Sequence, residues 1–298
     1  MRKLEIEDAK GNAMIELRDL TYIRLGASDL AASEKFATEI IGLQVGARSR
    51  SSLYLRSDRR SHTLCYFEGD PKDQTVGFEV DDDDALTRAA DALDLLNHRV
   101  RSGTKEEAEL RQVHNFIAFD DPSGNHIELV TRPQISGRRY FPSRDAGITG
   151  FNHIGLYSKD PIIDEGFWTK VCNARVSDRI SDIPLMRINA IHHTLALVKS
   201  DRTGIQHINH QVESVDDVMR SSYLLKKWNV PIIFGPGRHP TSGARFLYFA
   251  GPDGMVFEYS CGVGEIENEA THRPRQFGFE PSSFCMWGSE PGNLIPGA

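Results

Sequence analysis

The sequence predicts an α+β protein of two tandem domains, each built from two strand–helix–three-strand units. The first observation is an internal repeat: His62-Thr-Leu recurs as His193-Thr-Leu, 131 residues later. The octapeptide ending at Glu128 likewise matches the octapeptide ending at Glu258, 130 residues later. The second observation is that short strand patterns alternate with capped helix patterns in both halves. Four βαβββ units predict two incomplete, strongly curved sheets, each a half-closed barrel with helices outside.

In the first half, two helix patterns separate short alternating strands. The expected strands cover residues 20–25, 52–56, 62–68, 76–80, 115–119 and 126–130. Ser28 or Asp29 can cap a helix that runs to Ile41, and Gly42 is placed to end it. Aspartates 81–84 precede the second helix pattern, so their charge indicates a helix N-terminus rather than a cation site.

The second half opens after a Pro-, Gly-, Ser- and Arg-rich stretch, residues 131–147, which reads as a linker. The expected strands cover residues 151–157, 193–198, 208–213, 231–234, 245–250 and 255–260. Asp160-Pro161 starts one helix, and Ser214 with Asp217 resembles a capping box that starts the other. We therefore expect an N-terminal non-catalytic domain at 1–137, a metal-binding domain at 138–265 and a C-terminal tail at 266–298.

Composition excludes several classes of protein. The net charge of −7 argues against a nucleic-acid partner, and no apolar run reaches the ~18 residues of a membrane span. The N-terminus has no apolar segment typical of a secretory signal, and the four cysteines are widely spaced. These features predict a cytoplasmic protein with reduced thiols. Residues 1–18 are polar and are expected to form a loose arm, and edge strands favour a homo-oligomer.

The candidate site residues lie in the second half. His153 is on its first strand, His210 on its fourth unit's first strand, and Glu258 follows the apolar residues 255–257 after a Gly-Pro-Asp-Gly turn. A buried carboxylate is costly unless it is paired or binds a metal. Two histidines and a carboxylate on separate strands can bind Fe(II) or Mn(II) and leave coordination positions open. In the first half, Tyr22 and a residue near Gly77 stand where the histidines would be.

Strand alternation decides between two neighbouring histidines. Residues 208, 210 and 212 form a stripe with apolar neighbours, which predicts that His210 points inward and that His207 lies on the outer face. The first-half Glu128 is then expected to be solvated or salt-bridged.

One stretch carries a resemblance to a known family. It reads Gly237-x-His239, then Leu247-Tyr248-x-x-Gly251-Pro252-x-Gly254, and ends at Glu258. This resembles the signature of the type I extradiol ring-cleaving dioxygenases of the vicinal oxygen chelate superfamily, in which only the C-terminal domain is catalytic. Gly251 departs from the family's usual residue in a turn that does not touch the chemistry.

The resemblance implies a function. It implies Fe(II), with Mn(II) as an alternative, held by His153, His210 and Glu258, and O₂ as co-substrate. A substituted or bicyclic catechol would be opened beside its hydroxyls to a 2-hydroxymuconic semialdehyde-type product, in aromatic compound degradation. His193 matches the family's acid/base, and His239 and Tyr248 match residues that hydrogen-bond the substrate oxygens.

The sequence leaves rival interpretations open. Superfamily relatives include glyoxalase-type isomerases, thiol transferases and hydroquinone-cleaving enzymes, and a non-enzymatic metabolite-binding protein could use the same fold. The tail either packs across the barrel mouth or acts as a lid. Its aromatics, together with Trp168, predict an apolar, ring-sized pocket: Phe277, Phe279, Phe284 and Trp287. Arg273 or Arg275 could bind a substrate carboxylate or form surface salt bridges.

Overall fold

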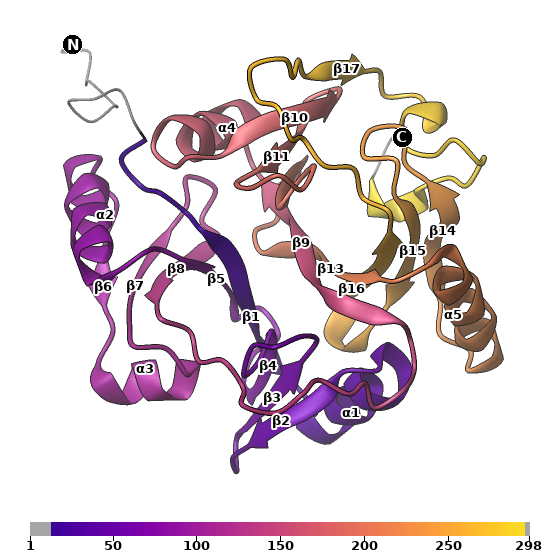
Figure 1. Ribbon diagram of the computed structural model, residues 1–298, viewed down its shortest axis with the longest axis horizontal. Coiled ribbons are helices and arrows are strands. Elements are labelled where there is room, and N and C mark those ends of the chain that lie inside the picture. Colours follow the sequence, from indigo (N-terminus) through magenta and orange to yellow (C-terminus); the bar gives the residue numbers. More distant parts are fainter. Residues whose placement is uncertain (1–12, 296–298) are drawn as a thin grey trace.

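The computed structural model describes residues 13–295, which form two curved sheets with helices outside them (Figure 1). The strands of the first half are β1 (Asp19–Ala27), β2 (Gln44–Arg48), β3 (Ser52–Arg56), β4 (Leu64–Glu68), β5 (Gln74–Glu79), β6 (Arg101–Ser102), β7 (Asn115–Asp120) and β8 (His126–Thr131). They form an eight-stranded sheet in the order β2-β3-β4-β1-β5-β8-β7-β6.

The second half repeats this plan. Its strands are β9 (Ile148–Ser158), β10 (Arg175–Ile180), β11 (Ile183–Arg187), β12 (Leu195–Lys199), β13 (Ile205–Val212), β14 (Ile232–Arg238), β15 (Arg245–Ala250), β16 (Val256–Cys261) and β17 (Arg275–Phe277). The order is β14-β15-β16-β13-β9-β12-β11-β10-β17. β1 pairs parallel to β4 and antiparallel to β5, and β9 pairs in the same way with β12 and β13. The predicted duplication and fold class are confirmed.

The predicted helix starts are confirmed by their caps. The carboxylate of Asp29 accepts a hydrogen bond from the backbone of Ala32 at the start of α1 (Leu30–Lys35), and Asp82 caps α2 (Asp83–Leu95). α1 widens into a π-helix, η1 (Phe36–Ile41), before Gly42 ends it with a φ of +94°. A side chain with a Cβ is sterically strained in this left-handed backbone conformation, whereas glycine adopts it without strain.

The second half uses the two predicted caps. Asp160 precedes α4 (Pro161–Lys170), and Ser214 forms a capping box with Asp217 at α5 (Val215–Lys227). A fifth helix, α3 (Lys105–Arg111), was not predicted from the sequence. It is only seven residues long, too short for a clear apolar period, although Thr104 and Glu107 form a capping box at its start.

Residues 13–17 of the N-terminal arm pack against the rest of the protein. Ile15 and Leu17 are buried, and the Ile15 amide donates to the Val171 carbonyl at 2.9 Å. The predicted loose arm is therefore wrong for residues 13–17, because these apolar side chains join the core. Residues 1–12 lie outside the described part of the chain.

The first half holds the turn and strand that carry Glu258. The Ser28 amide donates to Asp253 in the Pro252–Gly254 turn at 3.1 Å. The Tyr259 hydroxyl donates to the Ile41 carbonyl at 2.7 Å, and Phe36 packs against Phe257 with ring centroids 5.7 Å apart. Residues on both sides of Glu258 thus contact η1 and Ser28, the residue before the N-cap of α1.

The tail returns over the second sheet. β17 adds parallel to β10 at the sheet edge, and two short 3₁₀ turns follow, η3 (Pro281–Ser283) and η4 (Gly292–Leu294). In Figure 1 the yellow part of the tail that follows β17 lies beside β14 and β15. No helix in residues 13–295 is long and apolar enough to cross a membrane.

Candidate metal centre and substrate cavity

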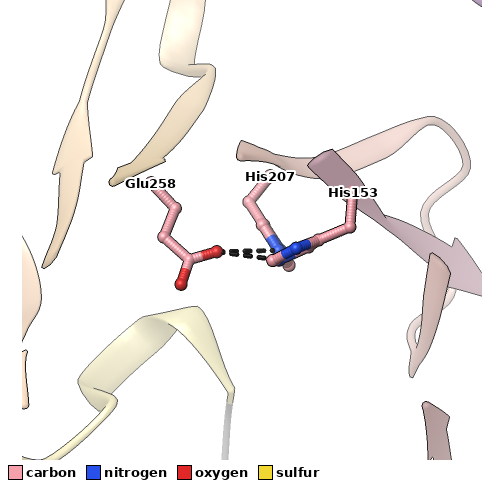
Figure 2. A group of neighbouring side chains, drawn as sticks. All are labelled: His153, His207 and Glu258. Atoms are coloured by element: carbon pink, nitrogen blue, oxygen red, sulfur yellow. Dashed lines mark hydrogen bonds and ion pairs between the residues drawn. The ribbon is translucent and has the colours of Figure 1, made fainter. Parts of the chain in front are cut away.

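Three buried side chains from three strands converge in the second half: His153 on β9, His207 on β13 and Glu258 on β16. One possible ligand atom from each lies within 4.8 Å of the others. Figure 2 shows both imidazoles pointing toward the Glu258 carboxylate, whose Oε2 lies 2.9 Å from His153 Nε2 and 3.5 Å from His207 Nε2. This is a two-histidine, one-carboxylate donor set.

The predicted placement of His210 in this cluster is wrong, and the pairing of β13 with β16 explains why. Asn209 pairs with Glu258, and the Asn209 side chain donates to the Ser260 hydroxyl at 2.9 Å, so these residues share one face. Alternation places His207 on that face and His210 on the other. The apolar stripe that includes His210 faces the hydrophobic core instead of the site.

His210 lies between Phe151 and Phe257, at ring centroid distances of 6.1 and 6.5 Å. Neither of its ring nitrogens has a hydrogen-bond partner, and burial lowers its pKa to about 4, so the ring is neutral at pH 7. β13 is covered on both faces, and an apolar stripe on such a strand does not mark the functional side.

Two neighbouring residues set the orientation of the His207 ring and the space around it. The His207 Nδ1–H donates to the side-chain carbonyl of Gln206, which leaves the lone pair of Nε2 beside Glu258. That Nε2 is buried and has no hydrogen-bond partner. Gly155 opposite makes the space, because a Cβ there would lie 2.4 Å from His207 Nδ1. The lone pair and the nearby carboxylate fit a divalent metal ion.

The electrostatics of the cluster agree with that fit. Burial opposes ionisation of Glu258, but the surrounding His153, His239 and His207 outweigh it and hold the pKa of the carboxyl well below its usual range. Burial lowers the pKa of His207 to about 3, so its imidazole stays neutral. Neutral imidazoles and an ionised carboxylate are the forms that bind metals.

The predicted catalytic residues His193, His239 and Tyr248 all adjoin this cluster. The His193 ring lies 4.1 Å from the His153 ring, centroid to centroid. The His239 Nδ1–H donates to the Phe284 carbonyl at 2.8 Å, and the Tyr248 hydroxyl lies 3.3 Å from His239 Nε2. The structure brings these three together with His153 and Glu258, as the sequence predicted; their roles remain predictions.

Their protonation states follow from burial. Burial, with a smaller effect of His153 and His192, lowers the pKa of His193 well below its usual value. Burial and the Glu258 carboxylate raise the pKa of Tyr248 well above its usual value. His193 is thus a neutral imidazole and Tyr248 a hydroxyl donor.

A largely apolar cavity opens beside the cluster, and its wall includes part of the tail. It is lined by Ile180, Ile183, Leu185, His193, Ala196, Val198, Gln206, His207, Phe234, His239, Thr241, Tyr248, Phe284, Leu294 and Ile295. Phe284 thus faces the cavity as expected, whereas Trp168 lies in the main core against Phe78 and Trp287 is largely exposed. Neither tryptophan lines the site.

Among residues 13–295, no lysine or arginine lines the cavity. Arg275 instead forms an ion pair with the buried Asp178 at 2.5 Å. Arg273 is exposed and donates to the backbone carbonyls of Ala270 and His272. The hypothesis that either arginine binds a substrate carboxylate gains no support from these contacts.

In the first half, the glutamate that corresponds to Glu258 is already paired with other side chains. The fully buried Glu128 accepts a hydrogen bond from the Tyr22 hydroxyl at 2.6 Å and pairs with Arg111 at 2.6 Å. Gly77 makes room for the phenol, because a Cβ there would lie 2.6 Å from the Tyr22 ring. The expectation of a salt-bridged Glu128 is confirmed, because the Arg111 guanidinium pairs with the carboxylate that corresponds to Glu258 in the repeat.

Known proteins resemble this chain over nearly its whole length. It is 26% identical to the iron-dependent extradiol dioxygenase of Rhodococcus jostii (strain RHA1), covering 93% of this chain and 98% of that protein. It is 27% identical to the biphenyl-2,3-diol 1,2-dioxygenase of Pseudomonas sp. (strain KKS102), with 92% and 97% covered. The fold matches the crystal structure of a halotolerant catechol dioxygenase with a TM-score of 0.84 at 23% identity, covering 96% and 98% of the two chains.

The family profile follows the duplication seen in the structure. It matches residues 19–129 and residues 150–259, which are the two sheet-forming halves. These matches cover most of the chain and include every residue of the candidate metal centre. The chain therefore belongs to the Glyoxalase/Bleomycin resistance protein/Dioxygenase superfamily.

Proposed function

We propose that the protein is an extradiol ring-cleaving dioxygenase that opens catechols with apolar substituents, using Fe(II) held by His153, His207 and Glu258. The observation that carries the proposal is the convergence of these ligand atoms within 4.8 Å, next to a cavity that His193, His239 and Tyr248 line. Relatives that align along most of the chain are named as iron-dependent extradiol and biphenyl-2,3-diol dioxygenases. Mn(II) suits the same donor set.

When bound, the iron supplies Lewis acidity toward the catechol oxygens and an open position for O₂. The protein supplies orientation. His239 and Tyr248 lie on the side of Glu258 that faces the cavity, with His239 Nε2 3.8 Å from Glu258 Oε1. Tyr248, which keeps its proton, can donate a hydrogen bond to a substrate oxygen and favour the ionised catechol.

His193 is the residue placed to move a proton. It is neutral, buried and at the cavity wall, so its free nitrogen can accept the proton of a substrate hydroxyl and return it later. Leu294, Ile295 and Phe284 from the tail reduce contact of this region with water. Exclusion of water strengthens the electrostatic interactions in such a site.

The metal assignment is tested with a pair of histidines on one strand. His207→Ala should lose metal binding and ring cleavage, whereas His210→Ala, the matched control, should keep both and lose only stability. Metal is quantified after anaerobic purification, and cleavage of a catechol panel is followed by oxygen uptake and yellow absorbance. Loss of metal in His210→Ala with retention in His207→Ala would reverse the assignment.

The same panel tests the substrate class. In the described part of the chain the cavity wall offers aliphatic and aromatic contacts and no lysine or arginine, so 3-alkyl and 3-aryl catechols should be cleaved faster than catechols bearing a carboxylate. A buried carboxylate without a partner is costly, which gives the direction of the preference. Equal kcat/KM for 3-methylcatechol and 3,4-dihydroxyphenylacetate would contradict it.

A further inference from the structure

A series of hydrogen-bonded, buried polar residues extends from His193 away from the cavity. His192 Nδ1 lies 3.1 Å from His193 Nδ1, and His192 Nε2 lies 2.9 Å from Asp178 Oδ2. All three residues are buried, with Asp178 completely inaccessible. None of the proposed roles of the metal ligands or of the substrate-binding residues requires His192 or Asp178. Buried polar chains of this kind are costly unless every member is satisfied.

Each hydrogen bond in the chain fixes the direction of the next. Asp178 accepts hydrogen bonds from the backbone amide and the guanidinium of Arg275, so it acts as an ionised acceptor. The proton between Asp178 and His192 must then sit on His192 Nε2. A neutral His192 has its lone pair on Nδ1, so His193 must donate from its own Nδ1.

From these contacts we infer that Asp178 and His192 are positioning residues, which hold His193 in the tautomer whose Nε2 is unprotonated and available to the cavity. This inference rests on the proposed function for its catalytic meaning. A histidine in the opposite tautomer would present a proton to the substrate hydroxyl instead of accepting one. The orienting group of a catalytic base commonly works in this way.

The C-terminal tail completes the chain. Arg275 belongs to β17, which pairs with β10 through Asp178 itself, and its guanidinium also donates to the Thr241 carbonyl. Burial disfavours the charge on Asp178, but the hydrogen bonds from His192 and Arg275 lower its pKa below the usual value. Docking of residues 275–277 therefore supports the ionised acceptor on which the His193 tautomer depends.

The decisive variant is Asp178→Asn, which keeps the shape and reverses one hydrogen bond. The amide of asparagine can donate to His192 Nε2, so His192 would donate from Nδ1 and His193 would carry its proton on Nε2. Imidazole ¹⁵N NMR distinguishes the two tautomers of a neutral histidine directly. We expect His193 to be the Nδ1–H tautomer in the wild type and the Nε2–H tautomer in Asp178→Asn.

The spectra are recorded on the full chain, both metal-free and loaded with diamagnetic Zn(II), and the His193 signals are assigned by their loss in His193→Phe. Asp164→Asn is the matched control: Asp164 is also a buried carboxylate, bonded to Ser123 and Ser158 away from the cavity. It should lower the melting temperature and leave the His193 tautomer unchanged. An unchanged tautomer in Asp178→Asn would overturn the inference.

Turnover provides an independent test. Asp178→Asn should lower kcat with 3-methylcatechol about 10- to 100-fold at an unchanged metal content. In the His193→Phe background it should lower kcat no further, because a residue that acts through His193 has no effect once His193 is gone. The same fold-loss in both backgrounds would make Asp178 merely structural.

Two further outcomes keep the inference separate from the proposed function. If Asp178→Asn does not fold, His192→Phe removes the same link, and His193 should then lose its fixed tautomer. If no catechol is cleaved by the wild type, the proposed function fails, while the NMR experiment still tests the hydrogen-bond chain.

Discussion

At the scale of single residues, the two halves solve the same electrostatic problem differently. In each, one glutamate on a sheet strand is buried: Glu128 on β8 and Glu258 on β16. Glu258 has the imidazoles of His153 and His207 beside it, whereas Glu128 pairs with the Arg111 guanidinium and accepts a hydrogen bond from Tyr22. A first-half glutamate with a guanidinium partner needs no metal.

Removal of Arg111 should therefore be costly. Arg111→Met leaves the Glu128 carboxylate buried with only the Tyr22 hydroxyl, and we expect a loss of about 3–5 kcal/mol in the free energy of unfolding. Arg101→Met is the control, because Arg101 pairs with Glu107 at the surface and should cost less than about 1 kcal/mol. Urea denaturation measures both, and recovery of stability in Arg111→Met/Glu128→Gln would confirm the cause. Equal small losses would contradict it.

The sequence predicted most residues of the site correctly, but not which face of β13 points toward it. His153, Glu258, His193, His239 and Tyr248 all lie at the site predicted for them. The repeat also contained a signal for the candidate ligand that was not predicted, since His207 lies 130 residues after Gly77, the same spacing that separates Glu128 from Glu258. The prediction rested on the apolar stripe and not on that spacing, and it therefore gave His210.

At the scale of elements, β13 explains that error. Its register to β9 shifts between Ile205 and His207 and again between Ile208 and His210. Across these shifts His207 and Asn209 still share one face and His210 lies on the other, so the alternation itself was predicted correctly. Both faces are buried, and a strand covered on both sides carries no polar face toward water that would mark the site. Helix starts were predictable because each depends on a local pair, as with Ser214 and Asp217, and not on distant packing.

The capping box of α5 makes a prediction for this scale. Ser214→Ala removes the hydroxyl that accepts from the Asp217 amide, and we expect a loss of about 1 kcal/mol in the free energy of unfolding. Ser214→Gly, the control, should lower the free energy of unfolding by only a few tenths of a kcal/mol, because glycine leaves the amides at the helix start open to water. Thermal unfolding compares them, and a greater loss for glycine than for alanine would argue against capping.

At the scale of the whole molecule, metal binding and stability should be linked. The site joins strands β9, β13 and β16, so a metal that binds only the folded chain stabilises all of them together. At a free metal concentration 100 times the dissociation constant, the gain is about 2.7 kcal/mol. Fe(II) or Zn(II) should raise the melting temperature of the wild type and of His210→Ala but not of His207→Ala, as measured by anaerobic calorimetry. An equal rise in His207→Ala would place the ion elsewhere.

The anchoring of the Glu258 strand on the first half has a consequence for the history of the gene. After a duplication, a copy without metal ligands is free to be deleted unless its partner has come to depend on it. Here the contacts of Ser28, Phe36 and Ile41 with Asp253, Phe257 and Tyr259 create that dependence. Selection on the half that carries the candidate metal centre therefore also preserves the other half, through three positions that lie outside the cavity wall.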